Sequence, residues 1–354
     1  MYQGRSRRCG ALMLTVSICL RLCMLLGLDT RATALVSEIV TSRSFAQWVL
    51  FLETGQKASI EQPLPQTQTV VIHYLQPQTG TEPKKRVPIE VHTNDLPQTL
   101  ASAEEITVSG SCTYSYDKQA LLLQPSAMDL SQEGPLVLIV HTHSSEAYTP
   151  EPGQEYAATA AYRTREEARS VIAVGDVLAQ TLEEKGISVL HDRTCNDDPS
   201  YNTSYWTTLQ KIQTWKQQYP GIQMVLDIHR DAVEDASGQA VALSSSQQGQ
   251  TAARLMLVVG TDQGGLEHSN WQENLANALK LQSVLQGQYP GLCRSLDLRK
   301  ERFNQHMTHG SLLVEVGSNG NTLNQAMYSA QLLGDALARM LHALQAYDGC
   351  LQSE

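Results

Sequence analysis

The feature that most constrains this chain is an apolar run that ends in two histidines and a glutamate. Residues 136–140 read Leu-Val-Leu-Ile-Val, and His141, His143 and Glu146 follow directly. Such a run is typical of a strand buried on both faces of a parallel sheet, and the ligands of these sheets gather where strands end. The sequence therefore predicts an α/β fold in which this strand delivers imidazole and carboxylate groups to one edge of the sheet.

From residue 134 to the C-terminus, apolar runs of strand length alternate with amphipathic segments of helical length. The expected strands are residues 136–140, 187–190, 224–228, 255–259 and 312–316. The expected helices are residues 166–185, 209–219, 271–288 and 323–346. This alternation indicates a mainly parallel, twisted sheet with helices on both faces, and we assign residues 134–354 to one catalytic domain.

The N-terminal segment, residues 1–34, has the pattern of a signal anchor. Arg5, Arg7 and Arg8 precede an apolar stretch at residues 11–28. Positive charge before an apolar stretch favours retention of the amino end in the cytoplasm. We expect an uncleaved membrane anchor that leaves the catalytic domain outside the cytoplasm. Small residues at 32–34 offer a cleavage site as the alternative, which would make the protein secreted.

Residues 35–133 form a second region of different character. Gln and Pro are frequent there, and the prolines interrupt short apolar runs. We interpret this region as an extended stalk or a small β-rich accessory unit.

Charge and cysteine content exclude some classes of protein. The formal net charge of the chain is −10, which disfavours electrostatic binding of nucleic acid. The seven cysteines show no Cys-x-x-Cys spacing, so neither a zinc finger nor a disulfide framework is predicted.

Two further strand ends carry the side chains that a catalytic metal site needs. His229 ends the run at residues 224–228, and Glu315 lies inside the run at residues 312–316. Catalytic zinc takes three protein ligands and keeps one position for water, while a nearby carboxylate moves the proton. We predict His143, Glu146 and His229 as zinc ligands and Glu315 as the catalytic proton carrier.

His143 and Glu146 form the His-x-x-Glu spacing that zinc carboxypeptidases also use. On an extended chain His141 shares a face with His143, so His141 is the alternate ligand. The polar residues considered for substrate binding are Arg230, Asp231, Asn304 and Asn319. Arg230 and Asp231 could equally pair with each other or support the site.

Several blocks from residue 134 onward resemble the stage II sporulation protein P family. They are His-Thr-His-Ser-Ser-Glu-Ala-Tyr at 141–148, Leu-Asp-Ile-His-Arg-Asp-Ala at 226–232, Leu-Val-Val-Gly-Thr at 257–261, Tyr-Pro-Gly-Leu at 289–292 and Glu-Val-Gly-Ser-Asn-Gly-Asn-Thr at 315–322.

The resemblance implies a zinc-dependent N-acetylmuramoyl-L-alanine amidase with a wall amidase-like fold, which also cleaves peptide cross-links of peptidoglycan. It implies a role in thinning the septal wall during engulfment of the forming spore. The implied partners are a lytic transglycosylase and a membrane scaffold protein. The implied site is His143 (or His141), Glu146, His229 and Glu315, whereas related wall amidases suggest Glu166 or Glu167 as the second ligand.

Two other functions stay open on the sequence. A zinc metallocarboxypeptidase would use the same four residues, with Arg230, Arg254 or Arg299 to hold a terminal carboxylate. A non-catalytic wall-binding module would need no metal, but it leaves the polar residues at buried strand ends unexplained.

Overall fold

The computed structural model describes residues 97–351. The predicted anchor and most of the predicted stalk region lie outside these residues. Within residues 97–351, no helix is both long enough and apolar enough to cross a membrane.

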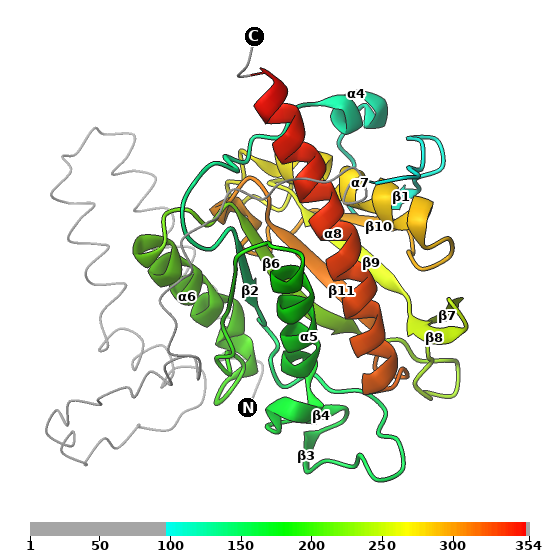
Figure 1. The fold of residues 1–354 in the computed structure, drawn as a ribbon. Coiled ribbons are helices and arrows are strands. Elements are labelled where there is room, and N and C mark those ends of the chain that lie inside the picture. The colour runs from blue at the N-terminus through cyan, green and yellow to red at the C-terminus, as the bar shows by residue number, and fades with distance from the viewer. Residues whose placement is uncertain (1–96, 352–354) are drawn as a thin grey trace, which may run out of the picture. The chain divides into compact units, whose positions relative to one another are not determined.

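A seven-stranded sheet forms the centre of the described region, in the order β1-β10-β9-β11-β6-β2-β5 (Figure 1). Its strands are β1 (Val108–Ser109), β2 (Val137–Val140), β5 (Val189–His191), β6 (Met224–Asp231), β9 (Leu255–Gly260), β10 (Leu296–Arg299) and β11 (Leu312–Ser318). Two small hairpins flank the sheet: β3 (Ala158–Ala160) with β4 (Arg163–Thr164), and β7 (Ser244–Gln247) with β8 (Gln250–Ala253).

The strands run in two groups of opposite direction. β5, β2, β6 and β11 are parallel to one another, and β9, β10 and β1 are parallel to one another. Where the groups meet, β9 is antiparallel to β11. The chain between β6 and β9 forms the β7–β8 hairpin rather than a helical crossover, and parallel strands need such a crossover. The prediction of a mainly parallel α/β sheet is confirmed, with this one antiparallel pair.

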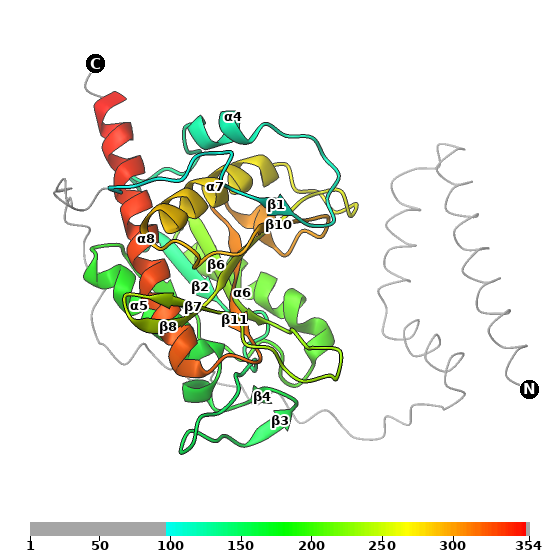
Figure 2. The same ribbon diagram turned by 90° about the vertical axis from the view of Figure 1, so that its right-hand side faces the viewer.

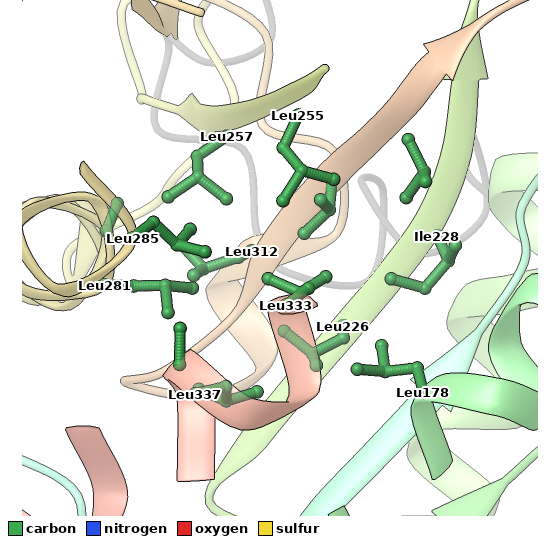
Figure 3. Packing of buried hydrophobic residues seen from close by; sticks show 14 of the residues in the cluster. Leu178, Leu226, Ile228, Leu255, Leu257, Leu281, Leu285, Leu312, Leu333 and Leu337 are labelled. Carbon is green, nitrogen blue, oxygen red and sulfur yellow. The ribbon is translucent and has the colours of Figure 1, made fainter. Parts of the chain in front are cut away.

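Helices cover both faces of the sheet. α5 (Val171–Glu184), α7 (Trp271–Gln288) and α8 (Leu323–Leu351) pack on one face, and α6 (Ser204–Gln218) packs on the other (Figures 1 and 2). The first face holds the larger apolar cluster, in which Leu178, Leu285 and Leu333 from these three helices converge on the strands (Figure 3). Burying each such leucine contributes about 1.5–3 kcal/mol.

Alternation along β6 decides which side chains reach which face. Leu226 and Ile228 join the larger cluster, whereas Val225 joins the smaller cluster beneath α6. Because successive side chains of a strand point to opposite faces, Asp227 and His229 lie on the α6 side. The strand thus places two ionisable groups together on one face.

Part of the predicted accessory region belongs to the sheet. β1 pairs with β10, and α4 (Lys118–Leu123) packs against α7. The predicted boundary at residue 134 therefore does not coincide with the edge of the folded layer. A two-residue strand and a six-residue helix are too short to give a periodic signal in the sequence.

Candidate active site and metal centre

His229 and Glu315 lie side by side on neighbouring strands. They are direct partners in the parallel register of β6 and β11. The remaining side chains of β11 at Leu312, Val314 and Val316 are buried in the larger cluster, so Glu315 points to the α6 face, as His229 does. Strand pairing therefore fixes the separation of the two groups.

The chain turns sharply after β2 and brings Glu146 to His229. Residues 142–145 form the turn, closed by a hydrogen bond from Glu146 N to His143 O of 3.0 Å. The carbonyl of Glu146 accepts a 2.8 Å bond from Val171 N, at the start of α5. Its carboxylate Oε2 lies 3.3 Å from His229 Nδ1.

Glu146 is held by two arginines as well as by His229. Its Oε1 lies 3.6 Å from Arg163 and 4.0 Å from Arg230, and Arg230 N donates to its Oε2 at 3.2 Å. These cations compensate for the cost of burying the carboxylate.

His143 lies against His229 and joins the cluster that His229, Glu146 and Glu315 form. The two imidazole rings meet edge to face, with centroids 5.2 Å apart. Tyr201 stacks on His143 at 4.2 Å, and Tyr205 meets its edge at 5.6 Å. Ser204 Oγ lies 3.3 Å from His143 Nδ1. Three residues, one in the short 3₁₀ helix before α6 and two in the first turn of α6, thus fix the orientation of this ring.

His141, the alternate ligand, lies elsewhere. Its Nε2 is 2.8 Å from His191 Nε2, and its Nδ1 is 3.0 Å from the carbonyl of Ile228. The expectation that His141 and His143 share a face is wrong, because β2 ends at Val140 and the turn reverses the direction of the following side chains.

Glu166 and Glu167 are both engaged away from the cluster. Glu166 Oε1 accepts a 2.7 Å bond from Ala157 N, and Glu167 forms an exposed ion pair with Arg193 at 2.7 Å. Of the three glutamates considered, the structure brings Glu146 to His229.

The four residues considered for substrate binding all make bonds within the protein. Arg230 is buried and donates to the carbonyls of Ala147 and Tyr162. The remaining contacts are Asp231 with Arg294 at 2.7 Å, Asn304 Nδ2 with Tyr205 O at 2.8 Å, and Asn319 Oδ1 with Val233 N at 3.1 Å. Each of these four side chains thus has a partner within the protein, and their role in substrate binding stays a prediction.

The surroundings of Glu315 and Glu146 shift the pKa values of these two carboxyl groups in opposite directions. Burial, together with the charge of Glu146, raises the pKa of Glu315 to about 8. Burial acts in the same direction on Glu146, but His229 and Arg230 outweigh it and lower the pKa of Glu146 to about 2. Pairs of carboxyl groups separated in this way mark distinct acid–base roles.

The histidines are also perturbed. Burial and the neighbouring His229 lower the pKa of His143 to about 4. Burial acts to lower the pKa of His229 too, but the carboxylates of Asp227 and Glu146 raise it well above its usual value. An ion that binds His229 must therefore displace a strongly held proton.

The chemistry of the donor set fits zinc. Two imidazoles and one carboxylate are a ligand set of catalytic zinc sites. Two ligands about 2.1 Å from a tetrahedral ion lie roughly 3.4 Å apart, close to the 3.3 Å between His229 Nδ1 and Glu146 Oε2. In residues 97–351, however, no group of three or more such side chains has the full arrangement of a metal site.

Glu315 Oε2 is a buried polar atom that forms no hydrogen bond, and His229 Nε2 has only its ion-pair contact with Asp227 Oδ1 at 3.0 Å. Most buried polar atoms are paired, so unpaired ones need a reason. Both belong to residues predicted from the sequence. Asp227 and Arg163 were not assigned roles there; the signal for Asp227 is an ionisable residue two positions before His229 on the same strand face.

The fold and the site define the chain as an α/β protein with a histidine–carboxylate centre at the strand ends. The family model of stage II sporulation protein P matches residues 53–338, and the chain belongs to this family. Stage II sporulation protein P of Bacillus subtilis (strain 168) is 27% identical over 216 residues, which cover 58% of this chain and 51% of that protein. The chain thus spans about half the length of this curated relative.

Solved structures with some similarity include N-acetylmuramoyl-L-alanine amidases. The N-acetylmuramyl-L-alanine amidase Ami1 from Mycobacterium smegmatis is 14% identical, with a TM-score of 0.35, covering 60% of this chain and 98% of its own. The CwlD amidase from Clostridioides difficile, solved in complex with the GerS lipoprotein, is 11% identical, with a TM-score of 0.33 and the same coverages of 60% and 98%.

Proposed function

We propose that this protein is a zinc-dependent peptidoglycan hydrolase that cleaves the amide bond between N-acetylmuramic acid and the L-alanine of the stem peptide. The observation that carries the proposal is the meeting of His143, Glu146, His229 and Glu315 at the strand ends of a chain in this sporulation family. Cleavage of peptide cross-links in the same site is a second activity of the proposal.

In the proposed mechanism His143, Glu146 and His229 hold the zinc ion. When bound, zinc polarises the scissile carbonyl and makes water more acidic. Glu315 accepts the proton of the attacking water and returns it to the leaving nitrogen. Burial raises the pKa of Glu315 to about 8 in the metal-free protein, so the proposal requires the nearby bound cation to lower this pKa and ionise Glu315 for the first step.

The cellular setting follows from the family and from the N-terminal sequence. Residues 1–34 anchor the chain in the membrane, and the catalytic domain acts outside the cytoplasm at the sporulation septum. There the enzyme remodels septal wall during engulfment, together with a lytic transglycosylase and a membrane scaffold protein.

Glu315→Gln tests the proposed catalytic role. We expect the release of stem peptides from purified cell wall to fall by about 10²–10⁴-fold, because the proton carrier is lost. Zinc content should stay at the wild-type level. Glu183→Gln, an exposed glutamate on α5, is the matched control and should retain activity. Normal turnover in the Glu315 variant would disprove the assignment.

The metallocarboxypeptidase alternative is disfavoured by the state of its three candidate arginines. Arg230 bonds to backbone carbonyls, Arg254 donates to the carbonyl of Cys293, and Arg299 pairs with Asp297 and Glu301. Digesting purified sacculi and free peptides side by side, with product masses, separates the two activities. A non-catalytic wall-binding module would bind no zinc and would be insensitive to a chelator.

A further inference from the structure

Asp227 is a buried carboxylate that the proposed catalytic scheme does not use. It lies on β6, two residues before His229 and on the same face, and is 5% exposed. Its ion-pair partner is His229 rather than a lysine or arginine. Burying a carboxylate is costly unless hydrogen bonds compensate for lost hydration, so the bonds of Asp227 show what holds it in place.

Both oxygens of Asp227 bind the first residue of the turn after β2. Thr142 N donates to Oδ1 at 2.8 Å, and Thr142 Oγ1 donates to Oδ2 at 2.6 Å. This turn carries His143 and leads into Glu146. The carboxylate therefore ties β6 to the segment that supplies the other two proposed ligands.

Asp227 also approaches the outer nitrogen of His229. Its Oδ1 lies 3.0 Å from His229 Nε2, a buried atom that forms no hydrogen bond with any other group. The other nitrogen, Nδ1, lies 3.3 Å from Glu146 Oε2. The imidazole is thus held between two carboxylates, one on each nitrogen.

We propose that Asp227 is the positioning residue of the metal centre. Its carboxylate fixes the ring orientation and the tautomer of His229, which leaves Nδ1 free for the metal beside Glu146. The same carboxylate holds the turn that carries His143 and Glu146. The inference rests on the proposed function. A carboxylate on the outer nitrogen of a metal-binding histidine selects which nitrogen keeps its proton and raises the basicity of the other. Asp227 differs from such a partner in also binding the loop of the remaining ligands.

Asp227→Asn tests this role in the full chain. Zinc affinity, measured on the metal-free protein by competition with a chelator, should fall by about 10–100-fold. Unchanged zinc affinity in a folded variant would overturn the proposal. If wild-type protein bound no zinc, the proposed function would fail instead, so the two failures are distinguishable.

Two comparison variants separate positioning from other roles. Thr142→Val removes the bond to Oδ2 and leaves the contact with His229, so it should lower thermal stability and weaken zinc binding less than Asp227→Asn does. An equal loss of zinc affinity in the Thr142 and Asp227 variants would show that Asp227 acts only by holding the turn after β2, which would overturn its proposed role on the His229 ring. Glu146→Gln should weaken zinc binding more than Asp227→Asn, and the reverse order would make Asp227 a ligand.

A measurement on the wild-type protein avoids any dependence on variant folding. Nitrogen-15 chemical shifts of His229 in the zinc-loaded protein should show a protonated Nε2 and a metal-bound Nδ1. A protonated Nδ1 with zinc on Nε2 would overturn the proposal.

Discussion

Two clusters of histidine and carboxylate flank the end of β2, on opposite faces of the sheet. On the α5 side, His141 contacts His191 at 2.8 Å, and His191 contacts Asp176 at 3.2 Å. On the α6 side, His229 lies between Glu146 and Asp227, with His143 and Glu315 beside it. The residue types are the same, so composition does not distinguish a structural cluster from a candidate catalytic one.

The two clusters differ in their hydrogen bonding and in how closely a helix packs on the histidines. Both nitrogens of His141 have hydrogen-bond partners, whereas the buried Glu315 Oε2 has none. In addition, α5 packs closely on His141: a Cβ at Gly175 would lie 2.6 Å from His141 Nε2. Glycine inside a helix costs about 1 kcal/mol relative to alanine, so close packing of α5 on the histidines explains this one. The comparison teaches that the candidate catalytic cluster differs from the other in holding a buried carboxylate oxygen, Glu315 Oε2, that forms no hydrogen bond.

The largest expected effect is on zinc affinity, which should respond differently to the loss of His143 and to the loss of His141. His143→Ala should lower zinc affinity by more than the roughly 10–100-fold caused by losing an outer hydrogen-bonding partner, because a ligand itself is removed. His141→Ala should retain zinc and instead lose about 2–4 kcal/mol of unfolding free energy, since it leaves a cavity and removes the partner of His191 Nε2. Metal analysis and denaturant unfolding of both variants measure the two effects. Loss of zinc from the His141 variant alone would reverse the assignment of the clusters.

The sequence predicted the elements that depend on local pattern. The helix expected at residues 271–288 matches α7 (Trp271–Gln288), and the apolar runs around His229 and Glu315 became β6 and β11. Apolar periodicity and helix-ending residues are local properties, so a single chain reveals them. The strand ends that carry the site were predictable for the same reason.

Features that depend on distant contacts were not predictable. The direction of β9 follows from the hairpin before it, and apolar pattern carries no sign of strand direction. The separation of His141 from His143 depends on where β2 ends. The link between Asp227 and Thr142 joins residues that are 85 positions apart.

An effect of intermediate size is expected on the pH dependence of the unfolding free energy, through His141. Burial and the nearby His191 lower the pKa of His141 to about 3 from an ordinary value of 6.5. The folded protein therefore keeps His141 neutral where the unfolded chain takes up a proton, so acid favours unfolding. The unfolding free energy of the metal-free protein should decrease as pH falls from 6.5 toward 3, with up to about 1.4 kcal/mol per pH unit from this group.

His141→Gln is the variant that isolates this contribution. Denaturant unfolding at several pH values below neutrality should give a shallower dependence than in the wild type, whatever the variant's absolute stability. His143, whose pKa is lowered to about 4 by burial and by His229, keeps its own contribution in both proteins. Identical slopes would show that His141 does not stay neutral in the folded state.

The smallest effect is expected at Glu167, the alternative to Glu146 that lies nearest the start of α5. Its carboxylate forms an ion pair with Arg193, and both side chains are about half exposed, at 47% and 45%. Solvent screens such pairs, so Glu167→Gln should change the unfolding free energy by less than about 1 kcal/mol and leave zinc affinity unchanged. Measured beside Glu146→Gln, it separates a ligand from a surface carboxylate. A loss of zinc at Glu167→Gln and not at Glu146→Gln would move the second ligand out of the turn after β2 and onto the segment before α5.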